Sequence, residues 1–375
     1  MNTVGGAYHV KPPMISKSGS FIHTMALTIS YDNEEFFFIT RRDSGEKSLI
    51  DEQLQTIWSD KVATGCFKYE LGDLSTKQLF GKYGFVVQLN ENRATKRRKP
   101  QLVFDVAMEF NPHEFHFGKV PEKEVIFIIQ PQHWLEREKN SHVLLINVSP
   151  LEYCHSLLVP SIEKCLPQIL KADEFRLAVE LMLKSKDSFF RIGFNSLGAF
   201  ASVNHLHFHA YYLKYELFIE NAPTKHLVDS ISNPCAVYEL LDFPAEGFVF
   251  EILEDIHVFD VTRSVVKLTD CLLANNIAHN VFLTRGRPLS KPTTDYSELN
   301  ALRIYVWARE AHYGVKDGNS FNVAVCELAG HIPMKDQESF KNITEEAIAS
   351  ELYKACHETF TAVRPIIKNM FHENL

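Results

Sequence analysis

Residues 194–213, FNSLGAFASVNHLHFHAYYL, contain three histidines at alternating positions, His205, His207 and His209. In an extended strand successive side chains point to opposite faces, so this pattern places the three imidazoles on one face, about 6.6–7 Å apart. The residues of the opposite face are all apolar and are expected to enter a core: Leu206, Phe208 and Ala210. Because buried imidazoles need hydrogen-bond partners, three of them on one strand indicate a functional site.

The composition is typical of a soluble globular protein that binds small molecules. The chain has 375 residues, of which 45% are hydrophobic and 23% charged, enough for one large core or two fused ones. Its formal net charge of −8 disfavours nucleic acid or an anionic membrane as the main partner. We expect neither secretion nor membrane spanning, since the chain begins without a signal-type apolar region and lacks an apolar run of about 18 residues. Seven cysteines without a C-x-x-C pair favour reduced thiols in the cytoplasm.

The order of predicted elements favours an internal duplication behind a flexible N-terminus. The expected parts are residues 1–20, rich in Gly, Pro and Ser; a first half, 21–230; and a second half, 245–375. In the first half, three apolar runs predict strands, residues 170–183 predict a helix, and two more strands follow, the last carrying the histidines. Strands, a helix and two strands recur in the second half, before a closing helix over 345–370. There RIYVWAR, 303–309, takes the place of the histidine strand, so the second half is expected to have lost the chemistry.

Three roles are open for the histidine strand. Imidazoles at i and i+2 can share a Zn²⁺ ion that activates water, although no H-E-x-x-H motif and no cysteine pair strengthens this hypothesis. The histidines can also serve only as hydrogen-bonding groups for backbone carbonyls. The third role is nucleophilic catalysis, in which one imidazole nitrogen attacks phosphorus while the other donates to a fixed carbonyl, giving a labile phosphoramidate.

Several motifs resemble those of a known superfamily. HLHFH resembles the H-φ-H-φ-H signature of the histidine-triad superfamily, whose flanking motifs are similar to Asn195-Ser196, Gly198, Ser202-Val203 and INVSPLEYCHSLLVP at 146–160. Longer strings are similar to the GDP-hexose phosphorylases, which belong with galactose-1-phosphate uridylyltransferase: SVNHLHFHAYYL at 202–213, GKYGFVVQLN at 81–90 and HNVFLTRG at 279–286. The resemblance spans most of residues 20–370.

This resemblance implies both a fold and a reaction. The fold is α+β and histidine-triad-like, with two fused triad-like halves whose antiparallel sheets are flanked by helices. The reaction is phosphorolysis of GDP-D-glucose to GDP and glucose 1-phosphate through a covalent guanylyl-histidine, with no metal or other cofactor. GDP-D-glucose and inorganic phosphate are then the partners, and a homodimer is the assembly that the uridylyltransferases suggest.

The resemblance also assigns catalytic roles by motif. His207 is the expected nucleophile, and the backbone carbonyl of His205 is expected to hold its far nitrogen. His209 stands where the plant phosphorylases and the uridylyltransferase have Gln and where the triad hydrolases have His. Since His can pass a proton whereas Gln only donates a hydrogen bond, a nucleotide-sugar or dinucleotide hydrolase that releases GMP stays open as the alternative. A regulatory nucleotide-binding protein would need a defective triad, and all three histidines are present.

The expected binding residues surround the triad. Asn195 and Ser202 match positions that touch the α-phosphate, and Asn147 matches a position that binds ribose hydroxyls. His155 matches a motif histidine whose role stays open. The basic run 93–99 has four possible roles, a nuclear address, an RNA contact, a positive rim that attracts phosphate or, as for most charge runs, a solvated loop. We expect its Arg97 and Arg98 to contact substrate.

Overall fold

The computed structural model describes residues 10–11, 26–31, 36–38, 45–98, 100–132, 140–228, 235–254, 257–289, 301–313 and 320–372, which form the predicted α+β fold. The strands are β1 (Val10–Lys11), β2 (Leu27–Tyr31), β3 (Thr76–Gln78), β4 (Val86–Leu89), β5 (Val125–Pro131), β6 (His142–Ile146), β7 (Ser156–Val159), β8 (Phe190–Asn195), β9 (Phe208–Tyr212), β10 (Thr224–Val228), β11 (Val237–Leu240), β12 (Phe248–Ile252), β13 (Ala278–Gly286), β14 (Ala301–Arg309) and β15 (His331–Met334). The helices are α1 (Leu49–Ala63), α2 (Glu91–Lys96), α3 (Ala172–Lys184), α4 (Val258–Ala274), α5 (Val325–Leu328), α6 (Gln337–Asn342) and α7 (Glu345–His372). The segment 1–20, predicted to be flexible, lies outside the described residues apart from β1.

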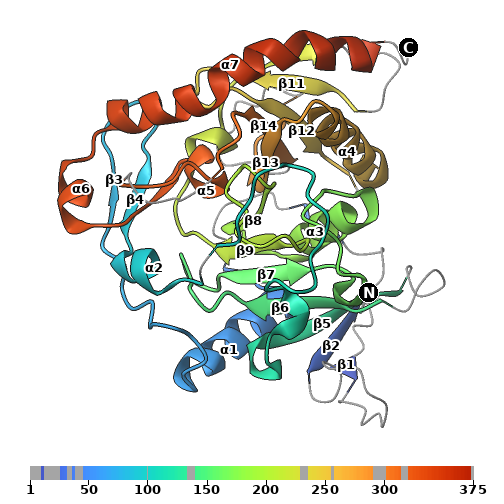
Figure 1. The fold of residues 1–375 in the computed structure, drawn as a ribbon, viewed down its shortest axis with the longest axis vertical. Helices are drawn as coiled ribbons and strands as arrows, with labels where there is room; N and C mark the ends of the chain where they lie inside the picture. The colour runs from blue at the N-terminus through green and yellow to red at the C-terminus, as the bar shows by residue number, and fades with distance from the viewer. Residues whose placement is uncertain are drawn as a thin grey trace, which may run out of the picture.

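A 12-stranded sheet runs through the molecule in the order β1-β2-β5-β6-β7-β9-β8-β13-β14-β12-β11-β10 (Figure 1). Its neighbours are antiparallel except for β2 and β5, which are parallel. The sheet contains two sets of five strands with the same internal order. One set is β5-β6-β7-β9-β8, and the other, counted inward from the opposite edge, is β10-β11-β12-β14-β13. The two sets meet where β8 pairs with β13. Strand β14 therefore takes the place of β9, while the predicted division of the chain at residues 230 and 245 stays a prediction.

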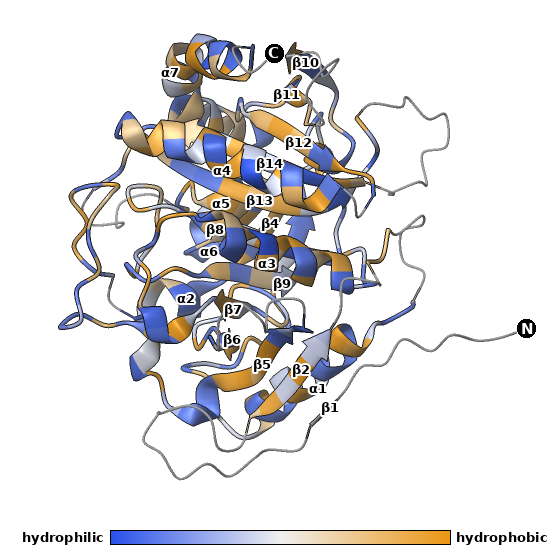
Figure 2. Cartoon of the chain, turned by 90° about the vertical axis from the view of Figure 1, so that its right-hand side faces the viewer, coloured by the Kyte–Doolittle hydropathy of each residue, from blue (hydrophilic) through white to orange (hydrophobic). Residues whose placement is uncertain are grey.

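The two faces of this sheet carry different layers. Helices α3 and α4 cover one face (Figure 2), and the core beneath them contains Leu206, Phe208 and Ala210, as the alternation of the histidine strand predicts. The opposite face packs against α5 and a small sheet, β15-β4-β3. Helix α7, which the sequence predicts at 345–370, joins both cores, because its first turns pack with the small sheet and its last turns with α4 and β12.

The histidine strand is shorter than predicted, since only His209 lies in regular strand β9. The backbone of His207 pairs instead with the side chain of Gln168, which accepts from the His207 N–H at 2.9 Å and donates to its carbonyl at 3.1 Å. The same amide nitrogen donates to the carbonyl of Asn195 at 2.8 Å. Gln168 thus replaces a strand neighbour and fixes His207 beside the end of β8.

Candidate active site

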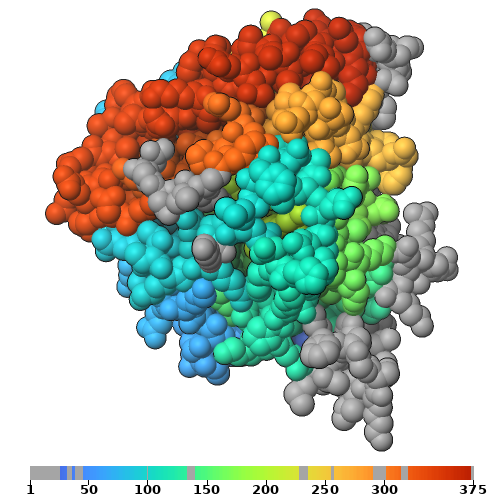
Figure 3. Space-filling view, viewed as in Figure 1, coloured from blue at the N-terminus to red at the C-terminus, as the bar shows by residue number. Residues whose placement is uncertain are grey.

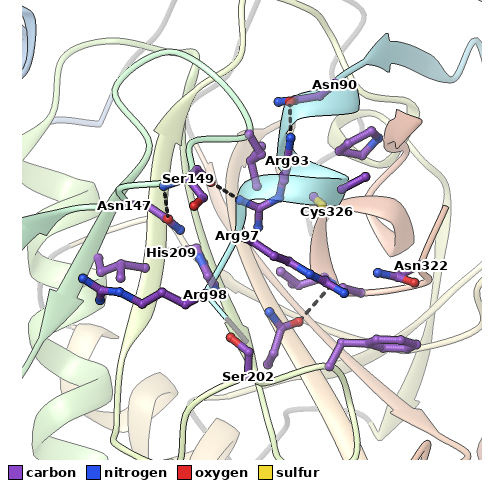
Figure 4. A pocket seen from close by; sticks show the side chains of 18 of the residues that line it. Asn90, Arg93, Arg97, Arg98, Asn147, Ser149, Ser202, His209, Asn322 and Cys326 are labelled. Atoms are coloured by element: carbon purple, nitrogen blue, oxygen red, sulfur yellow. Dashed lines mark hydrogen bonds between the residues drawn. The ribbon is translucent and has the colours of Figure 1, made fainter. Parts of the chain in front are cut away.

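A pocket of about 550 Å³ lies on the sheet face that packs against α5 (Figure 4). His207 and His209 line it, together with first-half residues from β6, β7 and α2 and second-half residues from α5, β15 and α6. The segment 100–120, teal in Figure 3, lies on the front of the molecule below the orange and red residues of the second half, and its Phe115 and Phe117 also line the pocket. Both halves of the chain therefore build this one site.

The ring of His207 is held in one tautomer. Its Nδ1 lies 2.8 Å from the backbone carbonyl oxygen of His205, and a carbonyl can only accept, so Nδ1 carries the proton. Nε2 is then the basic nitrogen that the ring presents to the pocket. The hydrogen bond predicted between these two histidines is present, and Phe117, whose ring centroid lies 4.9 Å away, packs against the imidazole.

The imidazole of His205 lies behind the pocket rather than in it. Its Nδ1 accepts from the backbone N–H of Phe117 at 3.1 Å, and burial, followed by the neighbouring His207 and His116, lowers the pKa of His205 to about 3. The neutral ring therefore anchors the turn that carries Phe117. His205 is not among the residues that line the pocket, so the three rings do not share one cavity, and in the described part of the chain no group of His, Cys, Asp or Glu is arranged to hold a metal ion.

His209 is oriented by His155, the histidine whose role the sequence left open. His155 Nδ1 accepts from the backbone N–H of Leu151 at 3.0 Å, so the proton of the neutral ring must sit on Nε2. Burial, with smaller effects of His209 and Arg93, keeps the pKa of His155 well below its ordinary value. Of the two groups near His155 Nε2, Asn147 Nδ2 at 3.3 Å can only donate, so the Nε2–H donates to His209 Nδ1, 2.9 Å away, which leaves the His209 proton on Nε2. His209 therefore presents an N–H donor, whereas His207 presents a basic nitrogen.

Three predicted binding residues, Asn147, Asn195 and Ser202, lie around these rings. Asn195 Oδ1 accepts from the backbone N–H of Val325 at 3.0 Å and from Asn280 Nδ2 at 2.7 Å, so its own amide nitrogen is the donor left for the pocket. Asn147 Oδ1 accepts from the Ser149 N–H at 3.1 Å. The described geometry brings all three to one cavity, and their contacts with substrate stay a prediction.

Arg97 and Arg98 both line the pocket but point in different directions, and the positive rim expected from the basic run stays a prediction. Arg97 ends α2 in an extended conformation (φ −71°, ψ 165°), so consecutive side chains point to opposite sides. Figure 4 shows Arg97 directed toward Asn322 and Arg98 directed away from it, with His209 between them. Arg98 Nη2 donates to both carboxylate oxygens of Glu124 at 2.9 Å. The two arginines therefore serve opposite ends of the pocket.

The second half lacks a triad but supplies one wall of the site. Its residues on β14 that stand in place of the histidines are structural: Arg303 and Tyr305 bind the Ile219 carbonyl, and Trp307 Nε1 donates to Ala245 O at 3.1 Å. In contrast, Asn322 and Lys335 line the pocket, with Lys335 Nζ donating to Asn322 Oδ1 at 3.0 Å. The end of the pocket toward which Arg97 points is therefore polar and cationic.

Family models match nearly all of the described chain. Residues 49–211 match the family described as GDPGP1-like, N-terminal domain, and residues 218–374 match GDPGP1-like, C-terminal domain. The chain belongs to the GDPGP1-like family. This confirms the resemblance to the GDP-hexose phosphorylases noted in the sequence.

Named relatives of this GDPGP1-like chain include phosphorylases from animals and plants. GDP-D-glucose phosphorylase 1 of Danio rerio is 43% identical over 308 residues, which cover 82% of this chain and 87% of the relative. The Homo sapiens protein of the same name is 42% identical over 314 residues, 81% of this chain and 79% of the relative. GDP-L-galactose phosphorylase 1 of Arabidopsis thaliana is 35% identical over 327 residues, 81% of this chain and 72% of the relative. The crystal structure of yeast Ap4A phosphorylase Apa2 in complex with Ap4A has the same fold, with a TM-score of 0.55 and 16% identity, and the match covers 82% of this chain and 97% of that one.

Several residues of the GDPGP1-like site carry no local sequence signal. Gln168 lies between a 3₁₀ turn and α3, Glu124 precedes β5, and Lys335 follows β15. Each is an ordinary polar residue at the end of an element, where solvent exposure is the usual outcome. Only the pairing of distant strands brings them to the histidines.

Proposed function

We propose that the protein is a nucleotidyltransferase that phosphorolyses GDP-D-glucose to GDP and glucose 1-phosphate. The observation that carries the proposal is His207, whose Nδ1 is fixed on the His205 carbonyl and whose Nε2 is thereby presented to a pocket built from both halves. Relatives at up to 43% identity that bear the name GDP-D-glucose phosphorylase 1 support the substrate.

In the first step, His207 Nε2 attacks the α-phosphorus of GDP-glucose. A bond forms between Nε2 and phosphorus, the bond from phosphorus to the bridging oxygen breaks, and its electron pair leaves with glucose 1-phosphate. The Nδ1–H···O bond to His205 stabilises the positive charge that develops on the ring. The amide nitrogen of Asn195 and the Nε2–H of His209 supply donors for the phosphate oxygens.

In the second step, an oxygen of inorganic phosphate attacks the same phosphorus. The phosphorus–nitrogen bond breaks, its electron pair returns to Nε2, and GDP is released. Phosphate is already an anion and needs no base, whereas water must lose a proton when it attacks. His209 Nδ1 accepts from His155 and its Nε2 is protonated, so this ring offers no basic nitrogen to water. The site therefore favours phosphorolysis over the hydrolase alternative.

Product analysis tests this function. The purified protein is incubated with GDP-glucose, with and without phosphate, and nucleotides and sugar phosphates are quantified. We expect GDP and glucose 1-phosphate in equal amounts, formed only with phosphate. GMP as the main product at saturating phosphate would make the protein a hydrolase. A panel of GDP-mannose, GDP-L-galactose, UDP-glucose and ADP-glucose then ranks the hexose and the base.

We propose, from the composition and the resemblance, that the enzyme works in the cytoplasm and forms a homodimer. All seven cysteines are free, which suits a reducing compartment. In the described residues no helix combines the length and the apolar character needed to cross a membrane. Light scattering coupled to gel filtration tests the dimer, and a mass of about 43 kDa at micromolar concentration would contradict it.

A further inference from the structure

The pocket has an apolar end that the chemistry at His207 does not use. Leu145 on β6 pairs with Leu157 on β7, and Leu157 pairs with His209 on β9. These two leucines line the pocket and belong to one apolar cluster with Phe117 and Val203. The end of the pocket beside His209 therefore has an apolar floor of two paired leucines, with the ring of Phe117 in the same cluster, and such a surface suits the apolar faces of a base.

One carboxylate stands at this apolar end. Glu124 lines the pocket with a side chain that is 8% exposed, and its two oxygens share the Nη2 of Arg98. The guanidinium of Arg98 lies over the ring of Phe115, 4.3 Å from its centroid. A single nitrogen occupies only one lone pair on each oxygen, so the carboxylate keeps acceptor capacity toward the pocket. Arg98 offsets the cost of burying the charge and holds it in place.

The other two carboxylates that line the described pocket stand on second-half elements, Glu327 on α5 and Asp336 at the N-cap of α6, and not on the strands that form the apolar floor. Glu327 accepts from the backbone N–H of Ala324 at 2.9 Å and from the thiol of Cys326 at 3.1 Å. Asp336 caps α6 by accepting from the Ser339 N–H at 2.8 Å. Glu124 is thus the carboxylate that can meet a ligand over the apolar floor.

The sheet gives the distance between the triad and Glu124. Strand β9 lies three inter-strand steps from β5, through β7 and β6, which amounts to about 14 Å at roughly 4.8 Å a step. Glu124 immediately precedes β5, and its neighbour Val125 pairs with Leu145. A nucleoside 5′-phosphate with its phosphate at His207 and its ribose near Asn147 would lie along this row, with the far edge of the base at Glu124.

We propose that Glu124 recognises guanine by accepting hydrogen bonds from N1–H and the 2-amino group, with the purine lying over Leu145 and Leu157. This inference rests on the proposed function in one respect: the α-phosphate lies at His207. Adenine has an acceptor at N1, and uracil places a carbonyl on either side of its only N–H, so neither base matches a carboxylate. Hypoxanthine keeps N1–H but lacks the 2-amino group, and xanthine has a carbonyl in its place.

Nucleotide binding tests the assignment without turnover. GDP, inosine 5′-diphosphate and xanthosine 5′-diphosphate are titrated calorimetrically into the wild type and Glu124→Gln. We expect the wild type to bind GDP at least about tenfold more tightly than the other two, because each lost pairing leaves a buried polar group unmatched. In Glu124→Gln the amide can donate to the xanthine carbonyl. The affinity for GDP should therefore fall by about 30-fold or more, and the ratio of the affinity for xanthosine diphosphate to that for GDP should rise.

A matched control and a second variant keep the test decisive. Glu122→Gln makes the same change on an exposed residue of the same 3₁₀ turn and should leave all three affinities unchanged. An unchanged ratio of GDP to xanthosine diphosphate in folded Glu124→Gln would overturn the proposal. If that variant does not fold, Glu124→Asp, which keeps the charge but shortens the reach, must lose the discrimination between GDP and inosine diphosphate. A wild type that binds these two equally also overturns it.

These binding results separate the inference from the proposed function. A wild type that prefers GDP through Glu124 but forms no glucose 1-phosphate would refute only the phosphorylase activity. A wild type that forms GDP and glucose 1-phosphate while Glu124→Gln keeps the same base preference would refute only the assignment of Glu124.

Discussion

His155 Nε2 lies 2.9 Å from His209 Nδ1, and the proton between them belongs to His155. The backbone N–H of Leu151 occupies the other nitrogen of His155, so this ring cannot change tautomer without losing that bond. His209 is consequently fixed as an acceptor toward His155 and a donor toward the pocket. A glutamine amide has the same two ends, an oxygen that accepts and a nitrogen that donates. The presence of His at this position therefore does not by itself imply an acid catalyst.

We expect His209→Gln to keep kcat within about tenfold of the wild type, because the amide nitrogen replaces the Nε2–H donor. His209→Ala should lower kcat by about 10²–10³-fold, the usual effect of removing one donor to a developing charge. Steady-state kinetics from about pH 6 to 8 should give the same profile for the Gln variant and the wild type. A His209→Gln protein as slow as His209→Ala would show that His209 acts as an acid.

His155→Phe tests the orienting bond. Phe keeps the ring but removes the donor, so His209 can adopt either tautomer and kcat should fall by about tenfold or more. The same change made in His209→Gln should have a smaller effect, because an amide has no second tautomer. Equal losses in both backgrounds, measured as a double-mutant cycle, would mean that His155 only supports the fold.

His207→Asn should abolish turnover while GDP affinity stays within about tenfold, or about 1.4 kcal/mol. The imidazole supplies the attacking nitrogen, whereas binding is spread over both walls of the pocket. Rapid-quench assays and GDP titration measure the two effects separately. Guanosine-labelled GDP-glucose should leave an acid-labile, base-stable label on the wild type and none on the variant. Turnover above a few per cent would refute His207 as the nucleophile.

The part of the site that could be predicted from the sequence is the part that local periodicity controls. The alternation of His205 with apolar residues correctly placed Leu206 in the core, and helix spacing correctly predicted α3 and α7 to within two residues at each end. These two features depend on strand and helix geometry alone. The hydrogen bond from His207 to the carbonyl two positions earlier was expected instead from the resemblance to the histidine-triad superfamily.

Other features depend on long-range packing and escaped prediction. The regular strand stops at Phe208 because the side chain of Gln168, 39 residues away, binds the backbone of His207. The basic run does not indicate that Arg97 and Arg98 point in different directions. The direction of Arg98 depends on Glu124, a residue 26 positions later in the chain, which pairs with it. A loop of the second half completes the site through Asn322, a residue type that most often marks a turn.

Arg97 and Arg98 should have separable effects on kinetics. Arg97 points to the end that holds Asn322 and Lys335, so Arg97→Gln should raise the apparent KM for phosphate by about three- to tenfold through loss of positive potential. Arg98→Gln should leave that KM within about twofold and weaken GDP binding instead, because Glu124 loses its partner. Initial rates over a phosphate titration check the difference. Equal increases in the phosphate KM of the two variants would indicate that both arginines belong to one positive rim.

Gly193 leaves room for the second half to approach the triad. A Cβ on this residue would lie 2.8 Å from Val325 Cγ1 and 3.2 Å from Cγ2, and the Val325 N–H binds Asn195. Gly193→Ala should therefore push α5 away and lower kcat by about tenfold or more through Asn195. Val325→Ala removes both methyl groups, so the double variant should recover most of the activity. Failure of this rescue would place the effect of Gly193 elsewhere.

His142 should make the fold acid-sensitive independently of the active site. Burial lowers the pKa of His142 to about 4, and its Nδ1 accepts from the Ser161 N–H at 3.1 Å. The unfolded chain, with an ordinary histidine pKa of about 6.5, binds the proton first, so stability falls as the pH drops below that value. From about pH 7.5 to 5 this residue alone should cost about 2 kcal/mol of unfolding free energy. His142→Asn keeps an acceptor for Ser161 but cannot titrate, so urea denaturation of the two proteins across this range should differ by that amount. Parallel curves would show that the imidazole stays neutral in both states or charges in both.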